Sequence, residues 1–201
     1  PPSSSAPSKT PSQSDTTGTP LDWAMAELEA GASMTAVTAE LAGKDGPACV
    51  TPLEPRRSAQ PFEALRQRAE SLGNPPALLV TLGPARDHRA RLGFAANFLA
   101  AGGFRTEESG PVESPEEAVR ALETAEAKLV VLCGSDRGYE QYAEATAGAL
   151  AEAGAGPILL AGKGGEREPA LRAAGVDLFI HLGCNVLEIL EQLLDAEEDR
   201  A

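Results

Sequence analysis

A regular alternation of short apolar runs and helical segments after Pro75 constrains the fold more than any other feature of the sequence. Helical spacing of apolar residues follows each run, over residues 87–101, 114–127, 139–154, 168–175 and 185–199. Five strand–helix units in a row predict one parallel sheet covered by helices on both faces. Such sheets most often adopt the flavodoxin-like order 2-1-3-4-5, so we expect an α/β, doubly wound, five-stranded domain. The predicted strands are ALLVTLG (77–83), FRTEES (104–109), KLVVLCG (128–134), PILLAG (157–162) and DLFIHLG (177–183).

We place this domain at residues 76–201. The residues before it differ from it in composition and in predicted structure. Residues 1–20 are rich in Ser, Thr and Pro and predict a disordered linker. Residues 21–75 predict a helical and extended connector. Two short helices meet at Gly31, with Ser33 capping the second, and a proline-rich stretch leads to a third helix over 62–72. Helices this short need another surface to pack on. Because the chain starts with Pro rather than Met, we expect a processed chain or a piece of a longer one.

The charge and the cysteine content restrict the classes of partner and the compartment expected for this protein. The chain has 30 acidic and 17 basic residues and a net charge of −13, which argues against binding to nucleic acid or an anionic membrane. No apolar run approaches the roughly 20 residues that span a bilayer. The three cysteines, Cys49, Cys133 and Cys184, form no CxxC pair, as expected of reduced thiols in a cytoplasmic protein.

Ligands of an open parallel sheet bind at the carboxyl ends of its strands. The loop after the first strand, Gly-Pro-Ala-Arg-Asp-His, lacks the glycines of a dinucleotide site. The histidines and cysteines are too few and too scattered for zinc, and no acid is placed to orient His181 in a catalytic triad. Asp136 after the third strand leaves open a phosphate-accepting regulatory domain, although no lysine ends the fifth strand.

The Asp87-His88 pair opens a different possibility. An imidazole on this loop can ligate a metal above the sheet, with a neighbouring acid to orient it. The alternative is that Asp87 is the N-cap of the following helix and His88 faces solvent. We expect His181 to be a hydrogen-bonded residue of the fifth strand, and Cys133 and Cys184 to act as small buried hydrophobes.

Several phrases together resemble a known family. They are PLEPRRSAQPFEALRQRAE, RLGFAANFLAAGGF, VVLCGSD and ALRAAGVDLFIHLGCNVLEIL. In combination, over roughly residues 21–196, the sequence resembles the C-terminal portion of the small, non-catalytic subunit of bacterial heterodimeric methylmalonyl-CoA mutase. The resemblance implies a flavodoxin-like domain of the cobalamin-binding type and a catalytic large subunit as partner. It also implies that adenosylcobalamin is held by that partner, through a D-x-H-x-x-G loop and S-x-L and G-G motifs.

This sequence departs from those motifs on three loops. Counted from Gly83, the motif's Asp, His and Gly fall on Ala85, Asp87 and Ala90; counted from His88, its Asp and Gly fall on Arg86 and Arg91. The S-x-L positions fall on residues 134–136, and the paired glycines are half kept at Gly162, with Gly164 and Gly165 just beyond.

We therefore expect no cofactor, metal or catalytic residue in this chain, and a supporting role for the catalytic large subunit of a heterodimer. The alternative is a working corrinoid-binding domain in which His88 ligates cobalt. If a cofactor does bind, the residues expected to contact it are Asp87, His88, Ser135, Gly162, Gly164 and Gly165.

Overall fold

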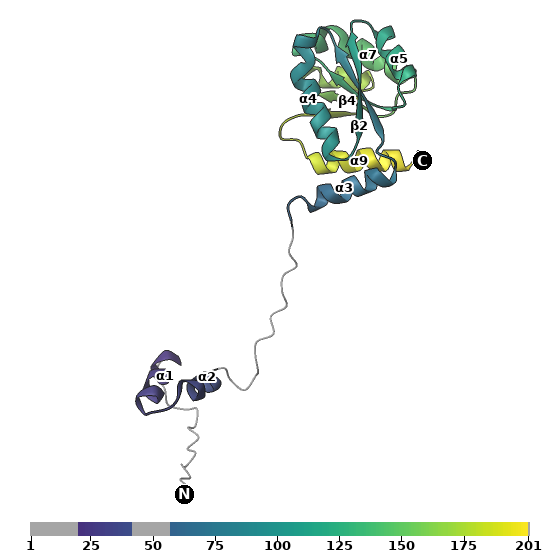
Figure 1. The fold of residues 1–201 in the computed structure, drawn as a ribbon. Helices are drawn as coiled ribbons and strands as arrows, with labels where there is room; N and C mark the ends of the chain where they lie inside the picture. Colours follow the sequence, from purple (N-terminus) through teal and green to yellow (C-terminus); the bar gives the residue numbers. More distant parts are fainter. Residues whose placement is uncertain (1–19, 42–56, 201) are drawn as a thin grey trace, which may run out of the picture. The chain divides into compact units, whose positions relative to one another are not determined.

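The structure is a computed structural model that describes residues 20–41 and 57–200. These residues belong to two units, divided between Pro55 and Arg56 (Figure 1). The predicted linker, except for its last residue, lies outside the described residues. So do most of the proline-rich connector and Cys49.

The first unit holds two short helices, α1 (Pro20–Glu29) and α2 (Met34–Leu41). The turn between them passes through Gly31, whose φ of 91° favours glycine. Ser33 caps α2, since its Oγ accepts a hydrogen bond from the backbone N–H of Ala36 at 3.2 Å. Both helices and the turn follow the sequence prediction. Ala24 and Val37 are the hydrophobic residues of this pair that are fully buried among the described residues.

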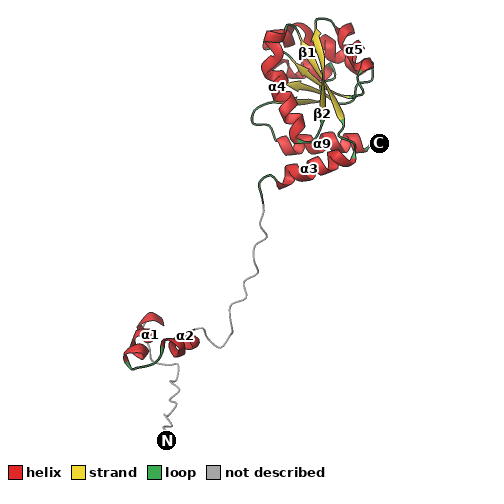
Figure 2. Cartoon of the chain, in the orientation of Figure 1, coloured by secondary structure: helices red, strands yellow, loops and turns green. Residues whose placement is uncertain are grey.

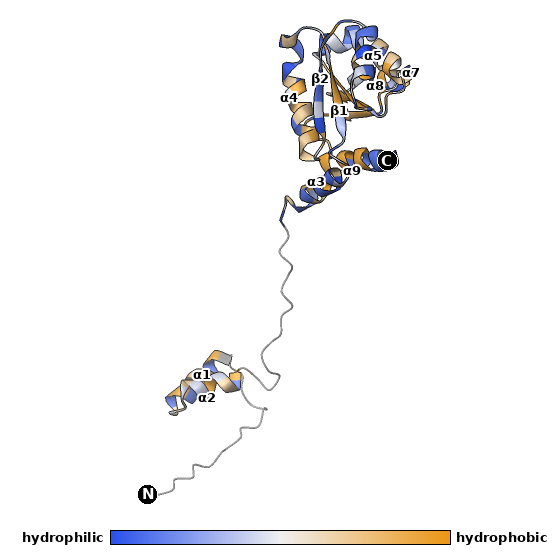
Figure 3. Ribbon diagram, turned by 45° about the vertical axis from the view of Figure 1, so that its right-hand side comes forward, coloured by the Kyte–Doolittle hydropathy of each residue, from blue (hydrophilic) through white to orange (hydrophobic). Residues whose placement is uncertain are grey.

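The second unit is built on a five-stranded sheet in which all neighbouring strands are parallel (Figure 2). The strand order is β2-β1-β3-β4-β5, so the predicted doubly wound, flavodoxin-like arrangement is confirmed. The edge strand β2 is mostly polar and appears blue in Figure 3, which protects its open edge from pairing with another chain. The strands are β1 (Pro76–Leu82), β2 (Arg105–Val112), β3 (Leu129–Cys133), β4 (Ile158–Ala161) and β5 (Leu178–Ile180).

Helices cover both faces of the sheet. Side chains from α3, α4 and α9 bury against one face, and side chains from α5, α7 and α8 bury against the other. Because helices cover both faces of each central strand, the side chains on both faces are apolar. This explains the continuous apolar runs in the sequence. The helices are α3 (Gln60–Ser71), α4 (Ala85–Ala101), α5 (Pro115–Thr124), α6 (Asp136–Gly138), α7 (Glu144–Glu152), α8 (Glu168–Ala173) and α9 (Val186–Glu198).

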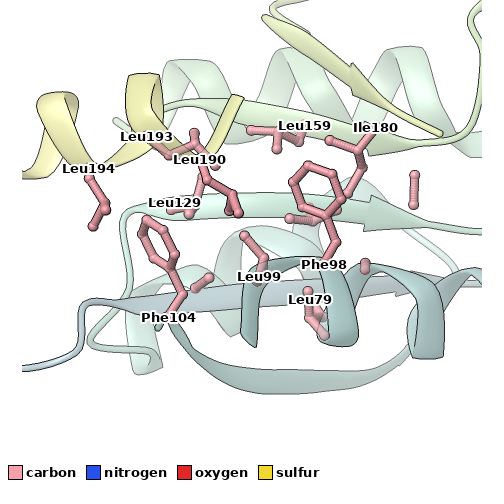
Figure 4. Close-up of a cluster of buried hydrophobic side chains, with 14 of the residues drawn as sticks. Leu79, Phe98, Leu99, Phe104, Leu129, Leu159, Ile180, Leu190, Leu193 and Leu194 are labelled. Atoms are coloured by element: carbon pink, nitrogen blue, oxygen red, sulfur yellow. The ribbon is translucent and has the colours of Figure 1, made fainter. Parts of the chain in front are cut away.

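The core on the α4 and α9 side is formed by leucines with two phenylalanines between them (Figure 4). Leu79 of β1 and Leu129 of β3 contribute from the sheet, and Leu99 of α4 packs over them. All three are at most 1% exposed. Aromatic side chains are scarce in this sequence, so leucine, valine and alanine supply most of the buried volume.

Helix α3 belongs to this second unit, which begins at Arg56. Its Leu65 and Ala69 are buried in the same cluster as Leu190 of α9, and α3 and α9 lie side by side in Figure 1. Arg68 on α3 adds ion pairs to Asp195 at 2.6 Å and to Glu198 at 3.0 Å. The helix predicted over residues 62–72 is thus built into the sheet domain rather than standing apart from it.

Two differences between the predicted and observed elements change the surroundings of His181 and Tyr139. Strand β5 has only three residues, so His181 follows the strand instead of lying inside it. The chain turns there, because the N–H of Cys184 bonds back to the carbonyl of His181 at 3.2 Å and Gly183 has a φ of 91°. The helix predicted over 139–154 starts with a π-helical turn, η1 (Tyr139–Ala143), before α7.

Candidate functional site

The loops that follow β1, β3 and β4 form the edge of the sheet where ligands bind in this fold. They lead into α4, into α6 and into a 3₁₀ turn, η2 (Gly165–Arg167), before α8. The candidate residues from the sequence lie on these loops or in the first turns that follow them.

Helix α4 begins two residues before its predicted start, which changes the roles of Asp87 and His88. Pro84 holds the N-cap position with extended backbone, so Asp87 is the third residue of the helix rather than its cap. No side-chain cap bond is formed at this end, and the Asp87 carboxylate pairs instead with Arg86 at 3.3 Å. The predicted N-cap role of Asp87 is therefore wrong, because proline already supplies the extended residue before the first turn.

His88 does not face solvent either. Its side chain is on the buried side of α4 and is 5% exposed. Its Nδ1 lies 3.1 Å from the carbonyl oxygen of Gly83, and because a carbonyl only accepts, Nδ1 carries the proton that is donated. The imidazole thus ties the first turn of α4 to the end of β1, and the prediction that it faces solvent is wrong.

Arg91, one turn further along α4, reaches across to the loop after β3. Its Nη1 donates to the carbonyl of Gly134 at 2.7 Å, and its Nη2 pairs with the carboxylate of Asp136. Its guanidinium carbon lies 4.8 Å from the centre of the Tyr139 ring, a cation–π distance. Burial is the largest single influence and opposes the charge of Arg91, but the hydrogen bond to Asp136 and the attraction of Tyr139 and Asp136 together outweigh it, so the pKa of Arg91 is raised. Arg91 thus links α4 to the loop after β3 through charged hydrogen bonds.

Tyr139 fills the gap at the ends of β3 and β4. It is 7% exposed, and its hydroxyl oxygen lies 2.7 Å from the carbonyl of Ala161 and 3.1 Å from that of Leu132. A Cβ added at Gly134 would lie 3.1 Å from this ring, and one added at Gly162 would lie 3.5 Å from it. The ring is therefore held between two glycines that bracket it on neighbouring loops, and burial raises the pKa of its phenol above the usual value.

The remaining predicted residues have local structural roles. Ser135 caps α6, since its Oγ accepts from the N–H of Gly138 at 3.1 Å. Gly164 lies so close to α8 that an added Cβ would be 2.6 Å from the Cβ of Glu168. Gly165 starts the 3₁₀ turn with a φ of 56°. These glycines serve the loop's own geometry.

Three hollows lie at this edge of the sheet. Asp87 and Ser135 line one of 220 Å³, together with Arg86, Arg137 and Gln141. Gly164 lines the other two, of 310 and 560 Å³, and the larger also takes in Gly165 and His181. The candidate residues are thus divided between separate hollows, and His88 and Gly162 are not among the residues that line them.

Within the described residues, neither a metal-binding cluster nor a membrane-spanning helix is present. Residues 20–41 and 57–200 contain no cluster of three or more His, Cys, Asp or Glu side chains arranged to hold a metal ion. None of the helices described here combines the length and apolar character needed to cross a bilayer. Cys133 is buried, which raises the pKa of its thiol to about 12, and Cys184 is half-buried.

Sequence reasoning missed Arg91 and Tyr139 as site residues. For Arg91 a signal existed, because counting the motif from His88 puts a long cation where a glycine is expected. For Tyr139 the spacing of apolar residues gave no signal. The direction of its side chain depends on a π-helical turn, which the ordinary helical period does not predict.

The sequence is similar to curated proteins that bear one name. The methylmalonyl-CoA mutase small subunit of Porphyromonas gingivalis is 36% identical over 155 residues, which are 73% of this chain and 24% of that protein. The same subunit of Streptomyces virginiae is 36% identical over 149 residues, 69% of this chain and 22% of that protein. The probable methylmalonyl-CoA mutase small subunit of Mycobacterium bovis is 33% identical over 144 residues, 69% of this chain and 23% of that protein.

Other comparisons add little. No family model matches the chain. Among solved structures, the signal receiver domain of a histidine kinase from Syntrophus aciditrophicus aligns with a TM-score of 0.41 at 17% identity, covering 62% of this chain and 91% of that one.

The chain spans about a quarter of the length of the curated relatives it matches. The match covers 73% of this chain, and the described residues of the chain form the predicted five-stranded parallel sheet. The chain is thus a homologue of part of the methylmalonyl-CoA mutase small subunit, and the resemblance predicted from the sequence is confirmed.

Proposed function

We propose that this chain is the cofactor-free, non-catalytic small-subunit portion of a heterodimeric methylmalonyl-CoA mutase, and that it supports the catalytic large subunit. The names of its relatives support the subunit role. The negative charge of the chain, −13, is compatible with a protein partner and unfavourable for nucleic acid.

The proposal that this chain binds no cofactor rests on one observation. Tyr139 and Arg91 occupy the space between the ends of β3 and β4. A corrin or its tail that entered between the ends of β3 and β4 would have to displace a ring that is 7% exposed. It would also break the bonds of Tyr139 and Arg91 to the carbonyls of Ala161 and Gly134. Each buried carbonyl left without a donor costs about 1–3 kcal/mol. The residues present therefore do not fit the group.

The alternative role of His88 as a cobalt ligand meets a second obstacle. The side chain is 5% exposed, so α4 has to move before a ring as large as a corrin reaches it. Arg86 and Arg91 also occupy the positions where the motif has Asp and Gly when it is counted from His88. We therefore propose that His88 is a structural residue that anchors α4 to Gly83.

In this proposal the chemistry belongs to the partner. Adenosylcobalamin bound there supplies the radical for the 1,2-rearrangement that interconverts methylmalonyl-CoA and succinyl-CoA. The residues of this chain pack, cap and pair with one another at the sheet edge, and no reaction step is assigned to them.

A reconstitution with the catalytic large subunit tests the proposal. The full chain and that subunit are mixed with adenosylcobalamin, and sedimentation velocity with absorbance detection gives the mass of the complex and its corrin content. We expect a one-to-one complex with one corrin, unchanged by His88→Ala. Two corrins per complex would contradict the cofactor-free assignment, and the absence of a complex would contradict the subunit role.

A further inference from the structure

The side chain of Tyr139 occupies the sheet edge in the way a bound ligand does. We call the space that its ring fills between the ends of β3 and β4 the crevice. The ring is buried, and its hydroxyl lies 2.7 Å from the carbonyl oxygen of Ala161 and 3.1 Å from that of Leu132. Because a carbonyl oxygen only accepts, the crevice presents two acceptors to one phenol proton.

The walls of the crevice fit a flat ring. An added Cβ would lie 3.1 Å from the ring at Gly134 and 3.5 Å from it at Gly162, so these two loops leave room for the ring only because they lack side chains there. The guanidinium carbon of Arg91 lies 4.8 Å from the ring centre, where a cation attracts the π-electrons. Arg91 is itself held by the carbonyl of Gly134 and by Asp136.

The two acceptors are held in place by the sheet rather than by Tyr139. In the parallel register, Leu132 of β3 pairs with Leu160 of β4, and Ala161 of β4 pairs with Ile180 of β5. Their carbonyls therefore keep their positions when the ring is absent. Binding groups that are fixed beforehand lose little freedom when a ligand arrives, which favours binding.

A small molecule has a route to this position. The hollow of 310 Å³ beside α8 is lined by Tyr139 itself, together with Lys163, Gly164 and Leu171 among others. Removal of the ring would open the space it leaves to this hollow. A ligand the size of the ring could then enter from solvent without any separation of β3 from β4.

We infer that the crevice is a preformed binding site for a neutral phenol, and that Tyr139 is its internal ligand, an autoinhibitory contact that keeps free phenols out of the wild-type chain. An ionised phenol is excluded, because it has no proton to donate and would face two carbonyl oxygens. Apolar cavities made by substitution can hold benzene, and here the two acceptors select phenol over benzene. The inference rests on the geometry of the crevice and not on the subunit role.

Tyr139→Ala in the full chain tests the inference, because phenol is the part of the side chain that this change removes. Isothermal titration calorimetry measures the dissociation constant for phenol, which we expect to be on the order of 1 mM. Differential scanning calorimetry measures Tm, which about 10 mM phenol should raise by about 3–6 °C. Benzene has no proton to donate and should bind at least about fivefold more weakly.

The wild-type chain and Tyr142→Ala are the controls. Tyr142 lies in the same π-helical turn and is half-buried, so this variant also loses a tyrosine ring but leaves the crevice filled. Phenol should not raise Tm in either protein. If Tyr139→Ala does not fold by itself, both chains are measured in trimethylamine N-oxide, an osmolyte that favours the folded state.

Each contrary result overturns a stated part of the inference. Without a rise in Tm or a heat of binding for Tyr139→Ala, the crevice is not a preformed site. Equal binding of benzene would overturn the selection of phenol by the two carbonyls. A rise in Tm of the wild-type chain would show that Tyr139 does not keep phenols out. None of these results bears on the reconstitution with the large subunit, which measures complex formation and corrin content.

Discussion

Removing the hydroxyl of Tyr139 tests how firmly the crevice is filled. Tyr139→Phe keeps the ring and its packing against the loops after β3 and β4, and deletes one proton donor. That donor serves the carbonyls of Ala161 at 2.7 Å and Leu132 at 3.1 Å, both in a site that is nearly closed to water.

The size of the effect follows from this geometry. A buried acceptor that loses its donor costs about 1–3 kcal/mol, and the ring volume is unchanged, so no cavity contribution is added. For a chain of this size, 1 kcal/mol shifts Tm by about 2–4 °C, so Tyr139→Phe should lower Tm by about 2–12 °C.

Tyr142→Phe is the matched control. Tyr142 lies in the same π-helical turn and is only half-buried, and its hydroxyl makes no hydrogen bond among the residues that the structure describes. Guanidinium chloride unfolding of the full chain, followed by circular dichroism, gives both free energies of unfolding. We expect a change within about 0.5 kcal/mol for Tyr142→Phe. If Tyr139→Phe stays within the same range, the crevice is not closed by this residue and the reasoning is refuted.

Three further predictions follow from other parts of the molecule. Burial raises the pKa of the Cys133 thiol to about 12. With the other two cysteines changed to serine, the native chain at pH 8 should therefore react with Ellman's reagent only as fast as it unfolds, whereas fast reaction would show an open site. Since folding raises this pKa, the thiol's contribution to stability is complete below the unfolded pKa of about 8.5 and declines as the pH rises above it. Gly103→Ala should destabilise the sheet domain by about 1–3 kcal/mol, because φ is 87° and the new Cβ would lie 2.7 Å from that of Ala69. Gly93→Ala in α4, where no atom lies within 4 Å of the new Cβ, should stabilise the sheet domain by about 0.5–1 kcal/mol. Denaturant melts in which Gly103→Ala and Gly93→Ala changed the free energy of unfolding equally would contradict this account. Ser114→Ala should cost about 1 kcal/mol in the same melts by removing the N-cap of α5, and an unchanged midpoint would contradict that role.

The fold could be predicted from the sequence because both faces of the central strands are buried. Runs such as Leu129–Cys133 are apolar at every position, and they alternate with helices over the whole domain. Lengths were less predictable. His181 continues the apolar alternation of β5 in the sequence, but the turn at Gly183 ends the strand before it.

The site was less predictable because it depends on where helices start and how they turn. Leu99, Ala95 and His88 lie four and seven residues apart and share the buried side of α4. Extending this spacing back from Leu99 indicates a buried His88, whereas reading Asp87 as the cap hides it. The position of Tyr139 had no such signal, since the π-helical turn that carries it breaks the 3.6-residue period.

The central claim is that Tyr139 and Arg91 occupy the space at the ends of β3 and β4, and that this chain does not hold a corrin. The most direct measurement is the absorbance spectrum of the purified full chain after incubation with hydroxocobalamin and desalting. We predict no retained corrin bands for the wild-type chain or for His88→Ala. Retained bands in the wild-type chain, with a spectral shift that disappears in His88→Ala, would contradict the claim and establish His88 as a cobalt ligand.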